Sequence, residues 1–120
     1  MANIYLDTNK VVDLLVRNPE LSGTLSGHHI CLSPLSAHIL FYTEKFPVPT
    51  PSINKSLMTM KFVSFDDRIL QKAINGPTKD LEDNIQLHSA VEADCDIFLT
   101  SDKRLLKMDY FGKVKISSSI

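Results

Sequence analysis

Short apolar segments alternate with longer segments of helical periodicity along the whole chain. Brief apolar runs bounded by polar or turn-forming residues predict strands at Ile4–Leu6, Ile30–Leu32, Phe62–Phe65, Ile97–Leu99 and Val114–Ile116. Helical spacing and end signals predict intervening helices: Lys10–Arg17, a short one within Pro19–Gly27, Leu35–Phe46, one near Ile53–Met60, one from Asp66 or Asp67 to about Asn75, a long one capped by Asp80 that ends near Ala93, and Asp102–Lys107.

The spacing of the predicted strands determines the expected fold class. Strands separated by a helix are too far apart in sequence to pair as hairpins, so they join through crossover connections and form a parallel sheet. Helices from such connections cover both faces of the sheet. We therefore expect an α/β protein with three layers, α/β/α, around a central, mostly parallel sheet of about five strands.

Composition adds limits to this picture. A chain of 120 residues with 43% hydrophobic and 22% charged residues fits one globular domain, residues 1–120. No apolar run approaches the roughly 18 residues needed to span a bilayer, and the N-terminus lacks a basic and apolar leader, so we expect a cytoplasmic protein. Cys31 and Cys95 lie in or beside apolar runs without metal-ligand spacing and are expected in the core.

Acidic residues stand where a site would form in this fold. Ligands of open α/β sheets bind beyond the carboxyl ends of the strands. Asp7 follows the first predicted strand, and Asp102 follows Ile97–Leu99 after two residues. Asp83, in the first turn of the long helix, can reach the same edge, and Asp80 lies one helical turn earlier. The sequence therefore places several carboxylates at one edge of the sheet.

Each acid also has a purely structural interpretation, because aspartate is a favoured helix N-cap and stabilises the first helical turn. A cluster of several carboxylates needs a further explanation, because like charges repel. Two carboxylates about 4 Å apart repel each other by about 4 kcal/mol at an effective dielectric constant of about 20, so three together require a cation. Oxygen ligands without nearby histidine or cysteine suit Mg²⁺ or Mn²⁺.

Three motifs carry a family resemblance. The start Ile4–Asn9, the central Asp80–Asn84 with its following helix, and the end Ile97–Lys103 resemble the pattern of PIN domains in its expected order, over nearly the whole chain. The resemblance implies a PIN-like fold and a metal-dependent endoribonuclease that hydrolyses RNA phosphodiester bonds, as in VapC-like toxins of toxin–antitoxin pairs. It implies an RNA substrate, an antitoxin protein as partner, and a homodimer.

The same resemblance assigns roles to individual residues. Asp7, Asp83 and Asp102 would bind the Mg²⁺ or Mn²⁺ ion and carry the catalysis. The residues expected to orient them or the attacking water are Asn9, Thr100 and Ser101, with Asp80 as a further supporting acid.

One departure from the family pattern leaves a second function open. The family usually places a glutamate on the helix after the second strand, and Ser33–Ile39 contains no acid. Glu44 is the next acid on that helix, more than a turn away, and His38 lies near the expected position. The alternative is a catalytically weakened or inactive PIN-like module that binds nucleic acid or protein.

The charge of the chain and its aromatic residues do little to distinguish the nuclease from the binding module. The net charge of −1 excludes a global basic field, so any RNA contact must be local, for example through the basic cluster of Lys103, Arg104 and Lys107. Phe41, Tyr42, Phe62 and Phe65 are expected in the core, not as a stacking platform for bases.

A phosphatase using Asp7 as nucleophile is disfavoured, because Asp7-Thr8-Asn9 lacks the Asp-x-Asp arrangement of haloacid-dehalogenase-like enzymes.

Overall fold

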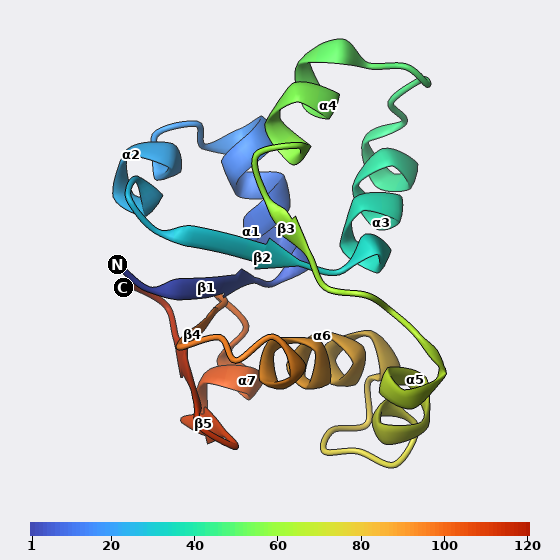
Figure 1. The fold of residues 1–120 in the computed structure, drawn as a ribbon, viewed down its shortest axis with the longest axis vertical. Helices are drawn as coiled ribbons and strands as arrows, with labels where there is room; N and C mark the ends of the chain where they lie inside the picture. The colour runs from blue at the N-terminus through green and yellow to red at the C-terminus, as the bar shows by residue number, and fades with distance from the viewer.

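The computed structural model describes all 120 residues and contains one six-stranded sheet (Figure 1). The strand order is β3-β2-β1-β4-β6-β5, with every neighbouring pair parallel except β5 and β6. The strands are β1 (Asn3–Leu6), β2 (His29–Leu32), β3 (Lys61–Phe62), β4 (Ile97–Leu99), β5 (Tyr110–Phe111) and β6 (Val114–Ser117). The expected α/β class with a mostly parallel sheet is confirmed.

Helices cover both faces of this sheet, with α1 to α4 above it and α5 to α7 below it in Figure 1. The helices are α1 (Thr8–Val12), which continues as a π-helical turn η1 (Asp13–Arg17), α2 (Leu21–Leu25), α3 (Pro34–Glu44), α4 (Pro51–Leu57), α5 (Asp67–Ala73), α6 (Leu81–Glu92) and α7 (Lys103–Leu106). The three expected layers are therefore present.

Side chains of β1 alternate between two separate cores. Ile4 and Leu6 point to the cluster formed with α1, α3 and α4, whereas Tyr5 points to the cluster formed with α6 and α7. All three are fully buried, as expected for a central strand of a parallel sheet with helices on both sides. Tyr5 stacks on Phe98 of the neighbouring strand β4, with ring centroids 5.3 Å apart.

The path of the chain through the sheet reverses direction at β1. The chain runs from β1 to β2 and β3 on one side, and then crosses to β4 and β6 on the other side. The strand order thus reverses at β1, and crevices of open α/β sheets form at such a reversal, outside the carboxyl ends of the strands. Asp7 and Asp102 follow the two strands that border it, β1 and β4.

The sheet has one more strand than expected. Tyr110 and Phe111 form the short strand β5, which pairs with β6 through a tight turn whose first residue, Gly112, has a φ of +60°. A two-residue turn with positive φ suits a glycine and matches the twist of the joined strands. Strand β3 is shorter than Phe62–Phe65, because only Lys61 and Phe62 pair with β2 at this edge of the sheet.

The prediction that four aromatic residues are buried was largely wrong. Phe41 packs against the upper core, but the exposed fractions of Tyr42, Phe62 and Phe65 are 75%, 40% and 36%. Tyr42 is exposed because it follows the buried Leu40 by two positions, about 200° around the helix, and so points away from the core. Cys31 and Cys95 are both buried, as predicted, and each is a free thiol.

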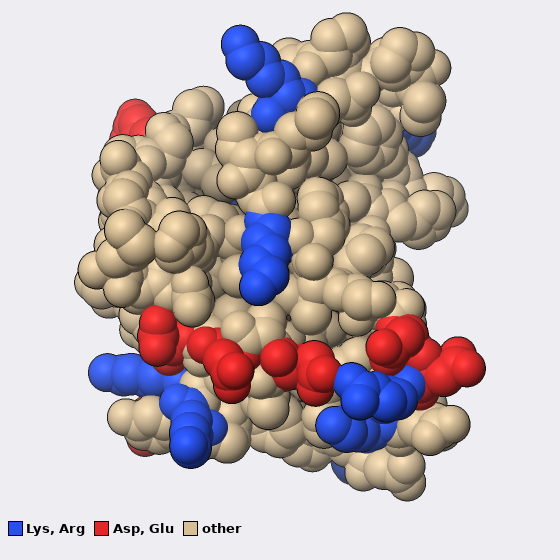
Figure 2. Space-filling view, viewed as in Figure 1, with Lys and Arg blue, Asp and Glu red and all other residues tan.

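The surface carries no extended basic face on the side seen in Figure 2. Acidic side chains form a band across the molecule there, and lysine and arginine side chains lie in separate groups on either side of it. This arrangement agrees with the balanced charge of the chain. No helix has the length and apolar character needed to span a membrane.

Candidate functional site

Asp7 lies at the end of β1, where its backbone N–H still donates to the carbonyl of Leu99 of β4 (3.1 Å). Its carboxylate does not cap the following helix, and its side chain is instead held from two other elements. The amide nitrogen of Gln86 on α6 donates to Oδ1 (3.0 Å), and the Thr100 hydroxyl donates to Oδ2 (2.7 Å). Since each carboxylate oxygen accepts one hydrogen bond, the orientation of the group is fixed.

Burial makes the negative charge of Asp7 costly. The residue is only 4% exposed, and this burial raises the pKa of its carboxyl group, although the bonds from Thr100 and Gln86 lower it in part. The nearby charge of Asp102 raises it further. A buried carboxylate held by neutral donors and facing another acid is an environment that favours a bound cation.

Asp102 caps helix α7 and is paired with Arg104. Its Oδ1 accepts from the Arg104 backbone N–H (2.8 Å), and its Oδ2 lies 3.2 Å from Nη2 of the Arg104 guanidinium. Hydrogen bonding to Arg104 lowers the pKa of this carboxyl group. The backbone N–H of Asp102 also donates to the Thr100 hydroxyl (3.0 Å), so Thr100 links Asp102 directly to Asp7.

Asp83 faces the same space from the first turn of α6. Its Oδ2 lies 3.9 Å from Nη2 of Arg104, which therefore stands between Asp83 and Asp102. Burial raises the pKa of the Asp83 carboxyl group to about 7, and the charges of Asp80, Asp7, Asp102 and Glu82 raise it as well. The raised pKa therefore reflects burial first, and then the acids gathered at one place.

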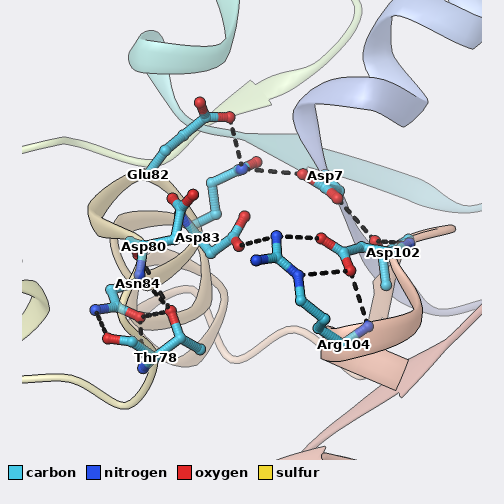
Figure 3. Close-up of polar contacts among 10 residues, drawn as sticks. Asp7, Thr78, Asp80, Glu82, Asp83, Asn84, Asp102 and Arg104 are labelled. Carbon is cyan, nitrogen blue, oxygen red and sulfur yellow. Dashed lines mark hydrogen bonds and ion pairs between the residues drawn. The ribbon is translucent and has the colours of Figure 1, made fainter. Parts of the chain in front are cut away.

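The start of α6 is fixed by two polar residues. Asp80 accepts from the Asp83 backbone N–H (3.0 Å) and so acts as the N-cap. Asn84, which is 3% exposed, accepts at Oδ1 from the backbone N–H of Thr78 (2.8 Å) and donates at Nδ2 to the carbonyls of Ala73 and Thr78 (both 2.9 Å). These bonds tie the preceding loop to α6 and hold Asp83 at the site (Figure 3).

Figure 3 shows that Asp7, Asp83 and Asp102, from three distant parts of the chain, lie around one space. Their oxygen donors have the chemistry that Mg²⁺ and Mn²⁺ prefer. No group of three or more His, Cys, Asp or Glu side chains is arranged to hold a metal ion together, and the Arg104 guanidinium lies between two of the acids. The residues fit a hard divalent cation by donor type and charge, provided that Arg104 moves aside.

Four of the other predicted residues lie outside this hydrogen-bonded group. Asn9 and Ser101 are exposed and make no side-chain hydrogen bond, and His38 is exposed and stacks on Tyr42, with ring centroids 6.5 Å apart. Glu44 is the last residue of α3, and its side chain makes no ion pair or hydrogen bond. Thr100, in contrast, is fully buried and bonded to Asp7.

The structure also brings residues to the site that the sequence analysis did not select. Gln86 and Glu82 of α6 approach Asp7, and Arg104 pairs with the acids instead of extending a free basic cluster. A polar residue amid the apolar positions of a buried helix face is a signal that could have identified Gln86, since Ile85 and Leu87 beside it are both core residues.

Comparison with known proteins establishes the fold. A chain in the crystal structure of VapBC2 from Rickettsia felis, bound to a DNA fragment from the promoter, matches with a TM-score of 0.68 over 96% of this chain and 97% of that chain. The chain has a VapC-like fold.

This VapC-like fold agrees with the PIN-like architecture that the three sequence motifs predicted. The two sequences are 12% identical, so the likeness concerns the fold alone. No protein-family model matches the sequence, and no curated protein sequence matches it.

Proposed function

We propose that this VapC-like protein is a metal-dependent endoribonuclease that hydrolyses RNA phosphodiester bonds, and that it serves as the toxin of a toxin–antitoxin pair. One observation carries the proposal: Asp7, Asp83 and Asp102 gather beside β1, at the reversal of strand order where sites of such sheets form. These three acids are the proposed ligands of Mg²⁺ or Mn²⁺. The ion, when bound, would supply Lewis-acid and charge-neutralising chemistry for hydrolysis.

The protein side chains prepare the site before substrate arrives. Gln86 and Thr100 hold the Asp7 carboxylate in one orientation, which avoids reorganisation of this ligand during the reaction. Asp80 and Asn84 hold the start of α6, and with it Asp83. Asp102 is oriented by its cap on α7 and by Thr100. Each proposed ligand therefore has its own support.

Arg104 is the proposed phosphate contact. Its side chain is 75% exposed and reaches the acids from the surface, so it can turn outward when a metal ion neutralises them. A planar guanidinium suits the paired oxygens of a phosphodiester. Since the chain carries no extended basic field, such local contacts must position the RNA.

The proposed partners follow from the fold likeness and the predicted family. The similar structure is a VapBC2 complex, which supports an antitoxin protein as the partner of this chain. A homodimer and action in the cytoplasm belong to the same proposal.

The test is RNA hydrolysis by the metal-depleted protein after addition of Mg²⁺ or Mn²⁺. We expect cleavage only with added metal, and we expect Asp7→Asn to lose at least about 100-fold in rate, because even residues that only orient metal ligands contribute about 10–100-fold. Asp67→Asn is the matched control, since Asp67 is an exposed acid of α5 outside the site.

Equal rates for the wild type and Asp7→Asn would contradict the proposal. Cleavage that persists without any divalent cation would contradict it as well. RNA binding without cleavage would instead support the alternative, a PIN-like binding module.

A further inference from the structure

Helix α3 offers no acid at the place where the PIN-domain pattern expects one. Ser36 is the α3 residue nearest to the site by its contacts, since its hydroxyl lies 2.9 Å from the Thr8 hydroxyl and donates to Oε1 of Gln86 (3.3 Å). Glu44 follows eight residues later, about 12 Å along the helix axis. The acid on α3 therefore cannot join Asp7 without a rearrangement of the helix.

Helix α6 supplies another carboxylate near Asp7. Glu82 lies one helical turn before Gln86, and the Gln86 amide nitrogen donates both to Asp7 Oδ1 (3.0 Å) and to Glu82 Oε2 (3.4 Å). Both hydrogens of one NH₂ group thus hold two acids of the site.

The orientation of the Gln86 amide is set by the chain. Its Oε1 accepts from the backbone N–H of Thr8 (3.0 Å), and this N–H can only donate. A flipped amide would place its NH₂ group against that donor, and the side chain is fully buried, so the nitrogen must face Asp7 and Glu82. Gln86 therefore positions acids specifically, beyond filling space in the core.

From these contacts we propose that Glu82 takes the place of the acid missing from α3, as a further carboxylate toward the divalent cation, and that Gln86 is the positioning residue for Glu82 and Asp7. This inference rests on the proposed metal-dependent function. Glu82 is half-buried and shares the Gln86 amide with Asp7. An acid in the first turn of a helix commonly stabilises only that helix, whereas Glu82 is tied to a second acid of the site.

The experiment measures Mn²⁺ binding to the full chain by electron paramagnetic resonance, together with thermal unfolding of the metal-free protein. We expect Glu82→Gln to weaken Mn²⁺ binding about tenfold, without lowering the unfolding temperature of the metal-free protein. Glu20→Gln, an exposed acid before α2, should bind Mn²⁺ as the wild type does.

Gln86→Glu provides a second variant that keeps an acceptor for Thr8 but replaces the donating NH₂ group with an oxygen. We expect it to weaken Mn²⁺ binding as well, because an oxygen then faces Asp7 and Glu82. Glu82→Gln tests the inference even if Gln86→Glu fails to fold.

The outcomes separate this inference from the proposed function. Unchanged Mn²⁺ affinity in Glu82→Gln, with affinity lost in Asp7→Asn, overturns the role of Glu82 and leaves the function standing. Mn²⁺ binding that depends on Glu82, without RNA cleavage, supports the inference and overturns the function. A wild type that binds no Mn²⁺ overturns both.

Discussion

The two sides of the acidic site are held in opposite ways. Asp7 is buried and takes its hydrogen bonds from neutral groups, the Gln86 amide and the Thr100 hydroxyl. Asp83 and Asp102 lie nearer the surface and share a charged partner, Arg104, whose side chain is 75% exposed. The buried side is part of the core and keeps its geometry. The negative charge of the outer side is balanced by the Arg104 guanidinium, which can turn away.

This difference indicates how a site of like charges can exist in a folded protein. Neutral donors fix the position of Asp7 without removing its charge, so its need for a cation remains. The Arg104 guanidinium meets that need for Asp83 and Asp102, and in the proposed function a divalent cation would replace it. We therefore expect variants on the two sides to behave differently. Variants on the buried side should bind the metal ion more weakly. Variants on the outer side should change how strongly Arg104 competes with the metal ion for the acids.

Among the residues that support the acids, the largest effect is expected on the buried side, from Thr100→Val. This variant removes the donor to Asp7 and the acceptor of the Asp102 backbone N–H while keeping the shape of the side chain. We expect metal affinity and RNA cleavage to fall by about 10–100-fold, and stability to fall by about 1–3 kcal/mol.

Cleavage rates, Mn²⁺ titration and chemical denaturation would measure these losses. Thr24→Val is the matched control, since Thr24 of α2 is exposed and its side chain makes no hydrogen bond. Equal metal affinity in Thr100→Val and the wild type would show that the buried side does not depend on its neutral donors.

A pH-dependent effect is expected from Asp83→Asn on the outer side. The pKa of the Asp83 carboxyl group is raised to about 7 in the folded protein, above its ordinary value of 3.8, so ionisation destabilises the fold. The metal-free wild type should lose stability from this group as the pH rises from about 4 to about 7. Because Arg104 lies 3.9 Å away and partly compensates, we expect Asp83→Asn to be more stable by about 1–2 kcal/mol at pH 8.

The gain should vanish near pH 3, where Asp83 is protonated in both the folded and unfolded states. Urea denaturation across this range would measure it, with Asp67→Asn as the matched acid. A gain of the same size at pH 3 and pH 8 would contradict crowding of charges at Asp83.

The smallest effect is expected from Arg104→Met, which removes the cation but keeps a long apolar side chain. Because the ion pairs of Arg104 are exposed, stability should change little. The variant should bind Mn²⁺ a few-fold more tightly at low ionic strength, since no guanidinium competes for Asp83 and Asp102, and it should bind RNA more weakly. Weaker Mn²⁺ binding would show that Arg104 organises the metal site instead of competing for it.

The sequence predicted the order of strands and helices because the residues that determine each element lie within it or directly beside it. Brief apolar runs marked β1, β2 and β4, and the caps Asp80 and Asp102 marked the starts of α6 and α7. Strand β5 was missed because two residues carry no periodicity. The parallel sheet followed from strand spacing alone, and it brought Asp7 and Asp102 to one edge.

The contacts between acids and their partners could not be predicted in the same way. Gln86 lies 79 residues from Asp7, and Thr100 lies 93 residues from it, so their pairing depends on how α6 and β4 pack on β1. Arg104 was assigned to a basic cluster, and only the turn of α7 after its cap returns its side chain to Asp102 and Asp83. Tyr42 was expected in the core because apolar character does not reveal which face of α3 meets the sheet.

The most direct test of the central claim is a crystal of the protein soaked in Mn²⁺ and measured at the manganese absorption edge. We expect an anomalous peak in contact with the carboxylates of Asp7, Asp83 and Asp102, with the Arg104 guanidinium turned away from the acids. Crystals that hold Mn²⁺ nowhere near these carboxylates, with Arg104 still between Asp83 and Asp102, would contradict the claim.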